Sequence, residues 1–444
     1  MTNGEINRLG DKVRAEYISD CLNENTLNEL QNYRTSHKDS LARVFNALCN
    51  INRKMGKQNI VTYRIKRFES IIGKLYRFPK MDFSRMWDIG GCRCIVNTNE
   101  EVYRLKELIE KSEVLVIRTT NDHIANPKPD GYKSLHLYIS LKSDKNKVIE
   151  LQIRNKEDHN WATLVEITDL LFDAKLKEYG KDKELLRFHY LLSKRFDLST
   201  EEKKEIAKTI NKYKYFEKLS NVFSRNYIQI RKQWLNIESK NNHCYFLIET
   251  KKDEVPKITS YKKFDEAEEN YFSIYKNNET ANVVLTHLPK PNYEQISIAY
   301  SNYILTFHSF LDDSYEIFER LIEKTLIDKK YFEFIKYFTS YNEIVYNHVK
   351  NLMSEVFEVY QISQKNSTNI RNYKLKSKEK DWVEDINNQA KKRQDKQRRI
   401  QVSMRQNIPK NGTLGNYIFT FISKRIAKKY NKKIKIIVEK MNIK

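Results

Sequence analysis

Between residues 61 and 180, short runs rich in β-branched and aromatic residues alternate with longer runs that have helical spacing. The β-rich runs are CRCIV at 92–96, VLVIRTT at 114–120, YKSLHLYISL at 132–141 and VIELQIR at 148–154, and the helical runs cover 100–111 and 157–179. This alternation restricts the fold strongly, because the strands must pair and the helices must cover the resulting sheet. Residues 61–180 are therefore expected to form an α+β or α/β domain of catalytic type.

The rest of the chain favours helices. Only 10 Gly and 7 Pro occur in 444 residues, a length that exceeds one ordinary core. We expect six parts: N-terminal helices at 1–60, the α+β domain at 61–180, a helical connector at 181–238, a small α/β unit at 239–300, a helical region at 301–370 and a basic tail at 371–444.

Positive charge is concentrated in that tail. The formal net charge of the chain is +23, and residues 371–444 contain 22 Lys and Arg against 6 Asp and Glu, a net of +16. Such clustering predicts a polyanionic partner, which is a nucleotide, a nucleic acid or, less favoured, an anionic membrane surface. Contact with RNA or the ribosome is the specific expectation for the tail.

The sequence also indicates a compartment. Its first residues, MTNGEINRLG, are polar and lack the apolar region of a signal peptide, and no apolar run approaches the ~20 residues of a membrane helix. The five cysteines form no even disulfide framework, and nothing near Cys92 and Cys94 completes a zinc site. We therefore expect a cytoplasmic protein with reduced thiols and no membrane contact.

One candidate carboxylate lies just before a predicted strand, and a second lies within another predicted strand. Asp88, in WDIGGCRCIV, precedes a strand and is followed by two glycines, which let backbone approach a ligand. Glu150, in VIELQIR, projects to the same strand face as Gln152 and Arg154. Two acidic residues at adjacent strand ends can hold one Mg²⁺. The alternative is that Asp88 caps a turn and Glu150 is a solvated strand residue.

A cationic stripe precedes them in YRIKRFESIIGKL. If this segment is helical, Lys66, Ser70 and Lys74 fall at i, i+4 and i+8 on one face, which suits a triphosphate. Arg64 and Arg93 add planar cations that suit phosphate or an adenine ring. The alternative is an ordinary solvated helix face.

The loop NDHIANPKPDGYKSLH offers a second set of contacts. Lys128 is a cation for phosphate, and Tyr132 is a ring on which a purine can stack, an interaction worth roughly 1–3 kcal/mol per base. The alternative for Tyr132 is a core tyrosine on a strand.

Together these segments resemble one family in order and spacing. RIKRFESIIGK, DIGGCRCIV, DHIANPKPDGYKSLH and IELQIRNKEDHNWA resemble the motifs of RelA/SpoT-type alarmone synthetases, which make (p)ppGpp. The resemblance covers about residues 40–180. It implies a nucleotidyltransferase-like mixed sheet flanked by helices, followed here by a mostly helical region with a small α/β unit. The implied reaction moves the β,γ-pyrophosphate of ATP to a ribose 3′-hydroxyl and releases AMP.

The resemblance also implies roles for individual residues. Asp88 would ligate Mg²⁺, and Glu150 would share the metal or act as general base. The donor ATP would be held by Arg64, Lys66, Ser70, Lys74 and Arg93. The acceptor would be held by Lys128, Tyr132, His136, Gln152 and His159.

The acceptor remains open at this point, between GDP or GTP, an adenine nucleotide and the 3′-end of tRNA. His159 stands where small members often carry Asn, and Ile167-Thr168 replaces the usual His-Lys after Glu166. Of three functional hypotheses, a (p)ppGpp synthetase is the most favoured. A toxin-like enzyme that modifies tRNA to block translation, for example in phage defence, is second, and an inactive RNA-binding module is third. A protein antitoxin or trigger would accompany a toxin-like enzyme. No His-Asp dipeptide occurs, so no hydrolase domain is expected.

Overall fold

The computed structural model divides the chain into two compact units built from interleaved segments. The first unit combines residues 1–162 with 230–301, and the second combines 163–229 with 302–444. The boundaries expected from composition remain predictions. The structure describes residues 1–55, 59–174, 176, 182–195, 197–220, 230, 232–234, 237, 242–250, 256–277, 282–289, 291, 295–296, 306–365, 375, 377–407 and 414–441.

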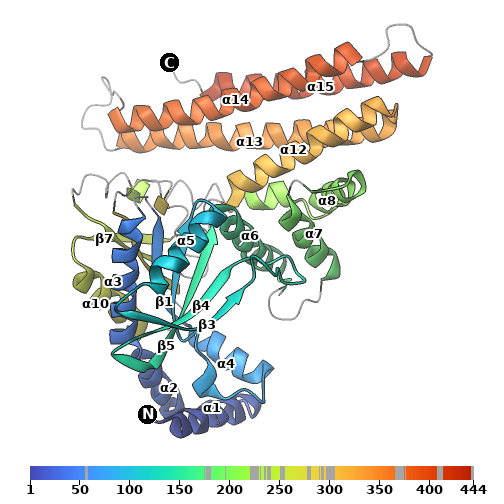
Figure 1. Ribbon diagram of the computed structural model, residues 1–444. Helices are drawn as coiled ribbons and strands as arrows, with labels where there is room; N and C mark the ends of the chain where they lie inside the picture. The colour runs from blue at the N-terminus through green and yellow to red at the C-terminus, as the bar shows by residue number, and fades with distance from the viewer. Residues whose placement is uncertain are drawn as a thin grey trace. The chain divides into compact units, whose positions relative to one another are not determined.

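The first unit is built on a sheet of eight strands in the order β3-β4-β5-β2-β1-β8-β6-β7 (Figure 1). Neighbouring strands are antiparallel except β2 and β5, which are parallel, so the sheet is mixed. The strands are β1 (Ile60–Ile65), β2 (Gly90–Val96), β3 (Leu115–Asp122), β4 (Leu135–Leu141), β5 (Asp144–Asn155), β6 (Tyr245–Thr250), β7 (Lys257–Tyr261) and β8 (Asn282–His287). The expected α+β class, a mixed sheet flanked by helices, is confirmed.

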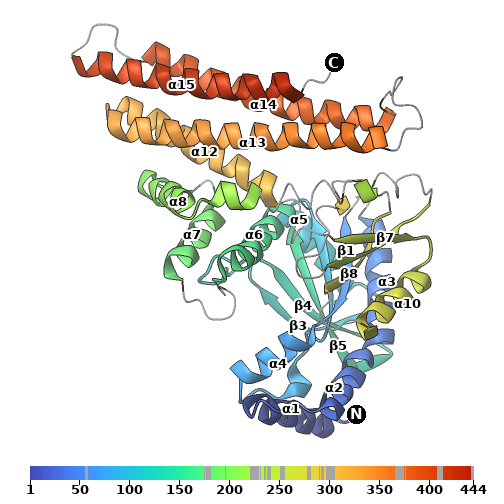
Figure 2. The ribbon, with the colours of Figure 1, turned by 180° about the vertical axis from the view of Figure 1, so that it is seen from behind.

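One face of this sheet is apolar and covered by helices. Helices α3 (Lys38–Lys54), α5 (Asn99–Glu110) and α10 (Phe264–Asn277) pack on it and share its core (Figures 1 and 2). Alternate strand residues point into that core, among them Cys92, Cys94, Leu137, Ile139, Leu151 and Ile153. Because side chains alternate along a strand, the residues between these point to the opposite face.

A second, smaller core supports the end of the sheet where β1 finishes. Helices α1 (Asn3–Ile18), α2 (Glu24–Thr35) and α4 (Phe68–Arg77) bury Leu9, Leu30, Ile71 and Leu75 together, with Phe83 of a short 3₁₀ helix (Phe83–Arg85). Gly10 allows this packing, since a Cβ there would lie 2.5 Å from Phe83 Cβ. Helix α4, which carries Ser70 and Lys74, is thus fixed by its apolar side.

Strands β6, β7 and β8, from the stretch expected to form a small α/β unit, extend the same sheet. Strand β8 pairs with β1, with Tyr63 opposite Leu285, and the Tyr63 hydroxyl donates to Glu268 Oε1 of α10 at 2.9 Å. The Tyr271 hydroxyl accepts from the Ile65 backbone N–H at 2.8 Å. Without β8, one edge of strand β1 would be unpaired. The alternation of apolar and polar residues in a sequence predicts a strand, but it does not identify the strand that pairs with it.

The second unit consists of helices. It includes α7 (Lys183–Lys194), α8 (Thr200–Lys212), α12 (Thr306–Ile327), α13 (Tyr331–Lys365), α14 (Ser377–Asn407) and α15 (Leu414–Met441), and the unit boundary falls inside α6 (Lys156–Phe172). Helices α12, α14 and α15 each pack against α13 (Figures 1 and 2). The mostly helical character expected after the α+β domain is confirmed, and the described residues of the basic tail form two long helices, α14 and α15. No described helix has the length and apolar character that a membrane crossing requires.

Candidate active site

Strand register gathers the polar candidates on the open face of the sheet. In β1 and β2, Arg64 lies opposite Gly91 and Thr62 lies opposite Arg93. Gly91 in turn lies opposite Glu150 of β5. Residues directly opposite one another in paired strands project to the same side. Arg64, Arg93 and Glu150 therefore share one face, across three adjacent strands.

The fourth strand completes this face. Gln152 of β5 lies opposite Arg93 on one side and His136 of β4 on the other, and Tyr138 of β4 lies opposite Glu150. The β4–β5 pair is antiparallel and the β2–β5 pair is parallel, but in both kinds of pair the side chains alternate between the two faces of the sheet. The sheet thus carries one polar surface that runs from the donor candidates to the acceptor candidates.

Asp88 is the centre of the donor side. It lies in the turn before β2, and its carboxylate accepts from Lys66 Nζ at 2.6 Å and from Lys74 Nζ at 3.0 Å. Burial raises the pKa of Asp88, but the two ammonium groups outweigh burial and hold it below its usual value. Burial lowers the pKa of Lys66 despite the opposing effect of Asp88. Lys66 and Lys74 meet on one carboxylate, but not through helical spacing. The expected single helix face is wrong for Lys66, which lies in the short connection between β1 and α4. Ser70 lies one turn before Lys74 on α4.

The acceptor side contains a closed ring of hydrogen bonds. His136 Nδ1 lies 3.1 Å from Glu150 Oε1, and His136 Nε2 lies 2.7 Å from the Tyr132 hydroxyl. Arg154 Nη2 donates to that hydroxyl at 2.6 Å and to Gln152 Oε1 at 3.0 Å. Gln152 Nε2 donates a hydrogen bond to Glu150 Oε2 at 3.1 Å, which closes the ring. Each of the five side chains is therefore oriented by two others.

These contacts shift the proton affinities of three groups. Burial raises the pKa of Glu150, but the bond and charge of His136, with Arg64 and Lys66, lower it to about 2. Burial lowers the pKa of His136, but Glu150 and Tyr132 raise it above its usual value. Burial raises the pKa of Tyr132, but Arg154 and His136 lower it to about 7. The ring thus favours an ionised Glu150 beside a protonated His136.

Cations also lie over the Tyr132 ring. Lys128 Nζ is 5.0 Å from the ring centroid and the Arg154 guanidinium carbon is 4.9 Å from it, while Trp161 is an edge-on neighbour at 6.5 Å. These distances are within the range of cation–π attraction. A purine could stack on Tyr132 only by sharing or replacing these contacts.

The structure adds residues that sequence reasoning left out of the site. Arg154 and Tyr138 are part of the polar surface, and Trp87 packs edge-on against Tyr138 at 5.6 Å. The signal for Arg154 was present, because it is four residues from Glu150 on one strand. His159 is fully buried on α6, so its expected acceptor role remains a prediction.

Asp88 and Glu150 also fit the expected Mg²⁺. Both carboxylates are held ionised, and Mg²⁺ is usually bound by one or two carboxylates, together with substrate phosphates. In the residues that the structure describes, no group of three or more His, Cys, Asp and Glu could hold a metal ion. The metal role of these two residues remains a proposal.

Comparison with known proteins decides the family of this domain. Residues 63–169 match the family model described as a region found in RelA / SpoT proteins. The chain contains a RelA/SpoT-type synthetase domain. This range includes every candidate site residue named above.

Individual relatives agree with the family model. The GTP pyrophosphokinase YwaC of Bacillus subtilis is 36% identical over 111 residues, which are 23% of this chain and 53% of the relative. A guanosine-3′,5′-bis(diphosphate) 3′-pyrophosphohydrolase of Borreliella burgdorferi is 28% identical over 159 residues, which are 34% of this chain and 23% of the relative. The chain therefore spans about half the length of the first and about a quarter of the second.

Among solved structures, the crystal structure of small alarmone synthetase 2 from Bacillus subtilis is similar. It is 27% identical with a TM-score of 0.32, and the match covers 37% of this chain and 91% of that one.

Proposed function

We propose that this protein is an ATP-dependent pyrophosphotransferase that acts on a ribose 3′-hydroxyl, with GDP or GTP as the acceptor and (p)ppGpp as the product. The observation that carries the proposal is the polar face of β1, β2, β5 and β4. It sets an oriented carboxylate, Glu150, between the cations of the donor side and the aromatic and basic groups around Tyr132. Phosphoryl-type transfer depends on such positioning and charge neutralisation more than on covalent chemistry.

The donor side is arranged to exchange one anion for another. The phosphates of ATP would compete with Asp88 for the ammonium groups of Lys66 and Lys74. Asp88 would then be available as an oxygen ligand for Mg²⁺, which when bound neutralises phosphate charge. Arg64 and Arg93, on the same face, are placed to contact the adenine or the phosphates.

The acceptor side is arranged to move one proton. In the proposed step, the 3′-oxygen of the acceptor bonds to the β-phosphorus of ATP, and the bond from that phosphorus to the α,β-bridging oxygen breaks. AMP leaves with the electron pair, and the hydroxyl proton passes to Glu150. A carboxylate with a pKa of about 2 is a weak base. Acceptor binding must therefore loosen the His136 contact for Glu150 to take the proton.

The 3′-end of tRNA is the second acceptor candidate, since it also presents a terminal ribose. The observation that favours it is the net charge of +16 in residues 371–444, which suits a phosphate backbone. In that case the protein would act as a toxin-like enzyme that blocks translation. The guanine-nucleotide acceptor stays first because the half-buried Tyr132 ring, with two cations near it, suits a single base with attached phosphates.

One labelling experiment tests both candidates. The full-length protein is incubated with Mg²⁺ and γ-³²P-ATP, together with GDP, GTP or bulk tRNA, and the labelled species is identified. Label on GDP or GTP supports the first proposal, and label on tRNA supports the second. Absence of label on every acceptor, from protein shown to bind ATP, would overturn pyrophosphate transfer.

A further inference from the structure

The helix α15 presents two different kinds of side chain to solvent. At its start, Tyr417, Ile418 and Phe421 are 65%, 52% and 64% exposed. Farther along, most of the exposed positions are basic: Lys424, Arg425, Lys428, Lys429, Lys432, Lys433 and Lys435. Its opposite face is buried in the helical unit through Phe419, Ala427, Tyr430 and Ile434. The helix as a whole carries eight Lys and Arg against one acidic residue.

The cations form a continuous row. Residues three or four apart on a helix lie on the same side, with their Cβ atoms about 5–6 Å apart. Tyr417, Phe421, Lys424, Lys428 and Lys432 follow that spacing, so two exposed rings are followed by a line of ammonium groups. We name this set, together with Arg425, the α15 face.

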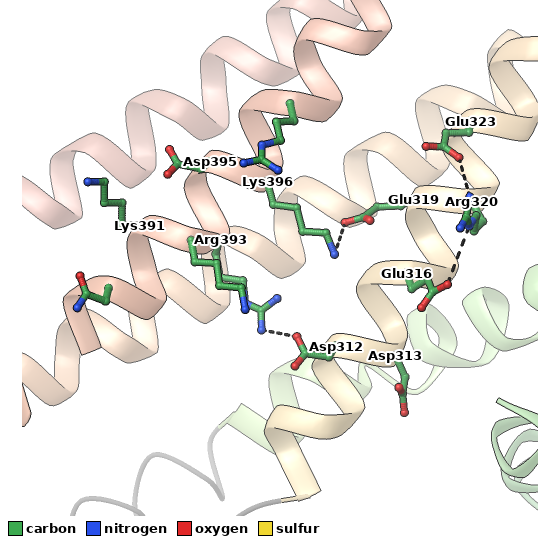
Figure 3. A pocket seen from close by; sticks show the side chains of 13 residues that line it. Asp312, Asp313, Glu316, Glu319, Arg320, Glu323, Lys391, Arg393, Asp395 and Lys396 are labelled. Atoms are coloured by element: carbon green, nitrogen blue, oxygen red, sulfur yellow. Dashed lines mark hydrogen bonds and ion pairs between the residues drawn. The ribbon is translucent and has the colours of Figure 1, made fainter. Parts of the chain in front are cut away.

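Helix α14 is basic too, but its surroundings differ. It faces α12 across a groove of about 950 Å³ (Figure 3). One wall of the groove carries Asp312, Asp313, Glu316, Glu319 and Glu323 from α12. Arg393 of α14 pairs with Asp312, and Lys396 Nζ lies 3.1 Å from Glu319. Carboxylates within a Debye length reduce the positive potential there and repel phosphate.

We propose that the α15 face is a docking surface for single-stranded RNA. Lys and Arg neutralise backbone phosphates, and exposed aromatic rings stack on unpaired bases without regard to sequence. An anionic membrane fits less well, because an interfacial helix inserts its apolar face and that face of α15 is already packed. The proposal does not rest on the proposed function, since the docked RNA need not be the acceptor.

Two charge-reversal variants of the full-length protein test the proposal. The first is Lys424→Glu, Arg425→Glu, Lys428→Glu and Lys432→Glu on α15. The matched control reverses the same number of exposed cations on α14: Lys391→Glu, Lys392→Glu, Arg398→Glu and Arg399→Glu. Binding of a fluorescent 20-nucleotide single-stranded RNA is measured by anisotropy between 50 and 300 mM salt.

We expect the α15 variant to lose about tenfold or more in affinity at 100 mM salt, and the α14 variant to lose less. The log–log salt slope should become shallower by up to about 3 in the α15 variant, at about 0.7 per lost phosphate contact. Equal losses in the two variants, or an α15 variant that binds like the wild type, would overturn the proposal.

The aromatic end gives an independent test that preserves charge. Tyr417→Ala with Phe421→Ala should weaken binding of single-stranded RNA by about fivefold or more and leave the salt slope unchanged, because stacking releases no counterions. Unchanged affinity would show that Tyr417 and Phe421 do not stack on unpaired bases, and it would overturn the proposal that the α15 face prefers single-stranded RNA. Binding to vesicles of anionic lipid, in place of RNA, would assign the α15 face to a membrane and overturn the proposal. Nucleotide pyrophosphorylation should continue in all three variants, which separates failure here from failure of the proposed function.

Discussion

The candidate active site and the α15 face are both basic, yet their charges are arranged in opposite ways. In the site, cations meet carboxylates at short range: Lys66 and Lys74 on Asp88, and His136 on Glu150. Helix α15 carries eight basic residues and one acidic residue, and seven of the basic residues are exposed to solvent in the part that the structure describes. Matched charges in a partly buried place orient groups for chemistry, whereas unmatched surface charges attract polyanions at a distance and respond to salt. This difference is the basis on which we propose catalysis for one region and docking for the other.

The largest effect is expected at the matched charges. Glu150→Gln keeps the size of the side chain and the bond to Gln152 in one amide orientation, but removes the proton acceptor. Transfer should fall by about 100-fold or more, which is typical for loss of a general base. Initial rates with saturating ATP and acceptor measure it. A variant with rates near those of the wild type would show that Glu150 lies outside the reaction.

Tyr132 tests whether the ring or the hydroxyl of this residue matters. The sequence favours the ring, which predicts a mild effect of Tyr132→Phe. The structure adds two bonds to the hydroxyl, from Arg154 at 2.6 Å and with His136 at 2.7 Å. Each such bond contributes about 0.5–1.5 kcal/mol, so we expect Tyr132→Phe to lose about tenfold in kcat/KM and Tyr132→Ala to lose more. Equal activity of the Phe variant and the wild type would make the hydroxyl bonds irrelevant to catalysis.

Much of this arrangement could be read from the sequence, because it depends on local periodicity. Strand alternation put Glu150, Gln152 and Arg154 on one face. Lys66 and Lys74 do meet on Asp88, but Lys66 precedes α4, so the helical spacing that the sequence suggested is not what joins them. The contacts that depend on strand order could not be read in this way. His136 lies beside Glu150 because β4 pairs with β5. The pairing of β8 with β1 joins residues more than 200 positions apart along the chain.

The pH dependence of stability tests the Glu150–His136 pair. The pKa of Glu150 is about 2 in the folded protein, against 4.5 unperturbed, so the stabilisation is present above pH 4.5 and is lost as pH falls toward 2. The shift corresponds to at most about 3 kcal/mol. Urea unfolding of the wild type and of Glu150→Gln should show a stability difference that narrows between pH 5 and pH 3. A constant difference would mean that the pair contributes nothing to folding.

The smallest effect concerns the seam between β1 and the 245–287 segment. Tyr63→Phe removes the buried hydrogen bond to Glu268, so that carboxylate loses one hydrogen-bond donor. We expect a loss of about 1 kcal/mol in the free energy of unfolding, the typical net contribution of one hydrogen bond, measured by urea denaturation. Glu268→Gln retains an acceptor for the Tyr63 hydroxyl and is the matched control, for which a smaller loss is expected. If Tyr63→Phe is as stable as the wild type, this bond does not help to join the two segments.

The stoichiometry of the nucleotide products tests the central claim most directly. Purified protein is incubated with ATP, Mg²⁺ and GDP or GTP, and the products are quantified by mass spectrometry for the wild type, for Glu150→Gln and for the fourfold α15 variant. We predict one AMP for each acceptor that gains two phosphates, almost no product from Glu150→Gln, and wild-type yields from the α15 variant. ADP in place of AMP would mean that only one phosphate leaves the donor, and it would contradict pyrophosphate transfer by this site.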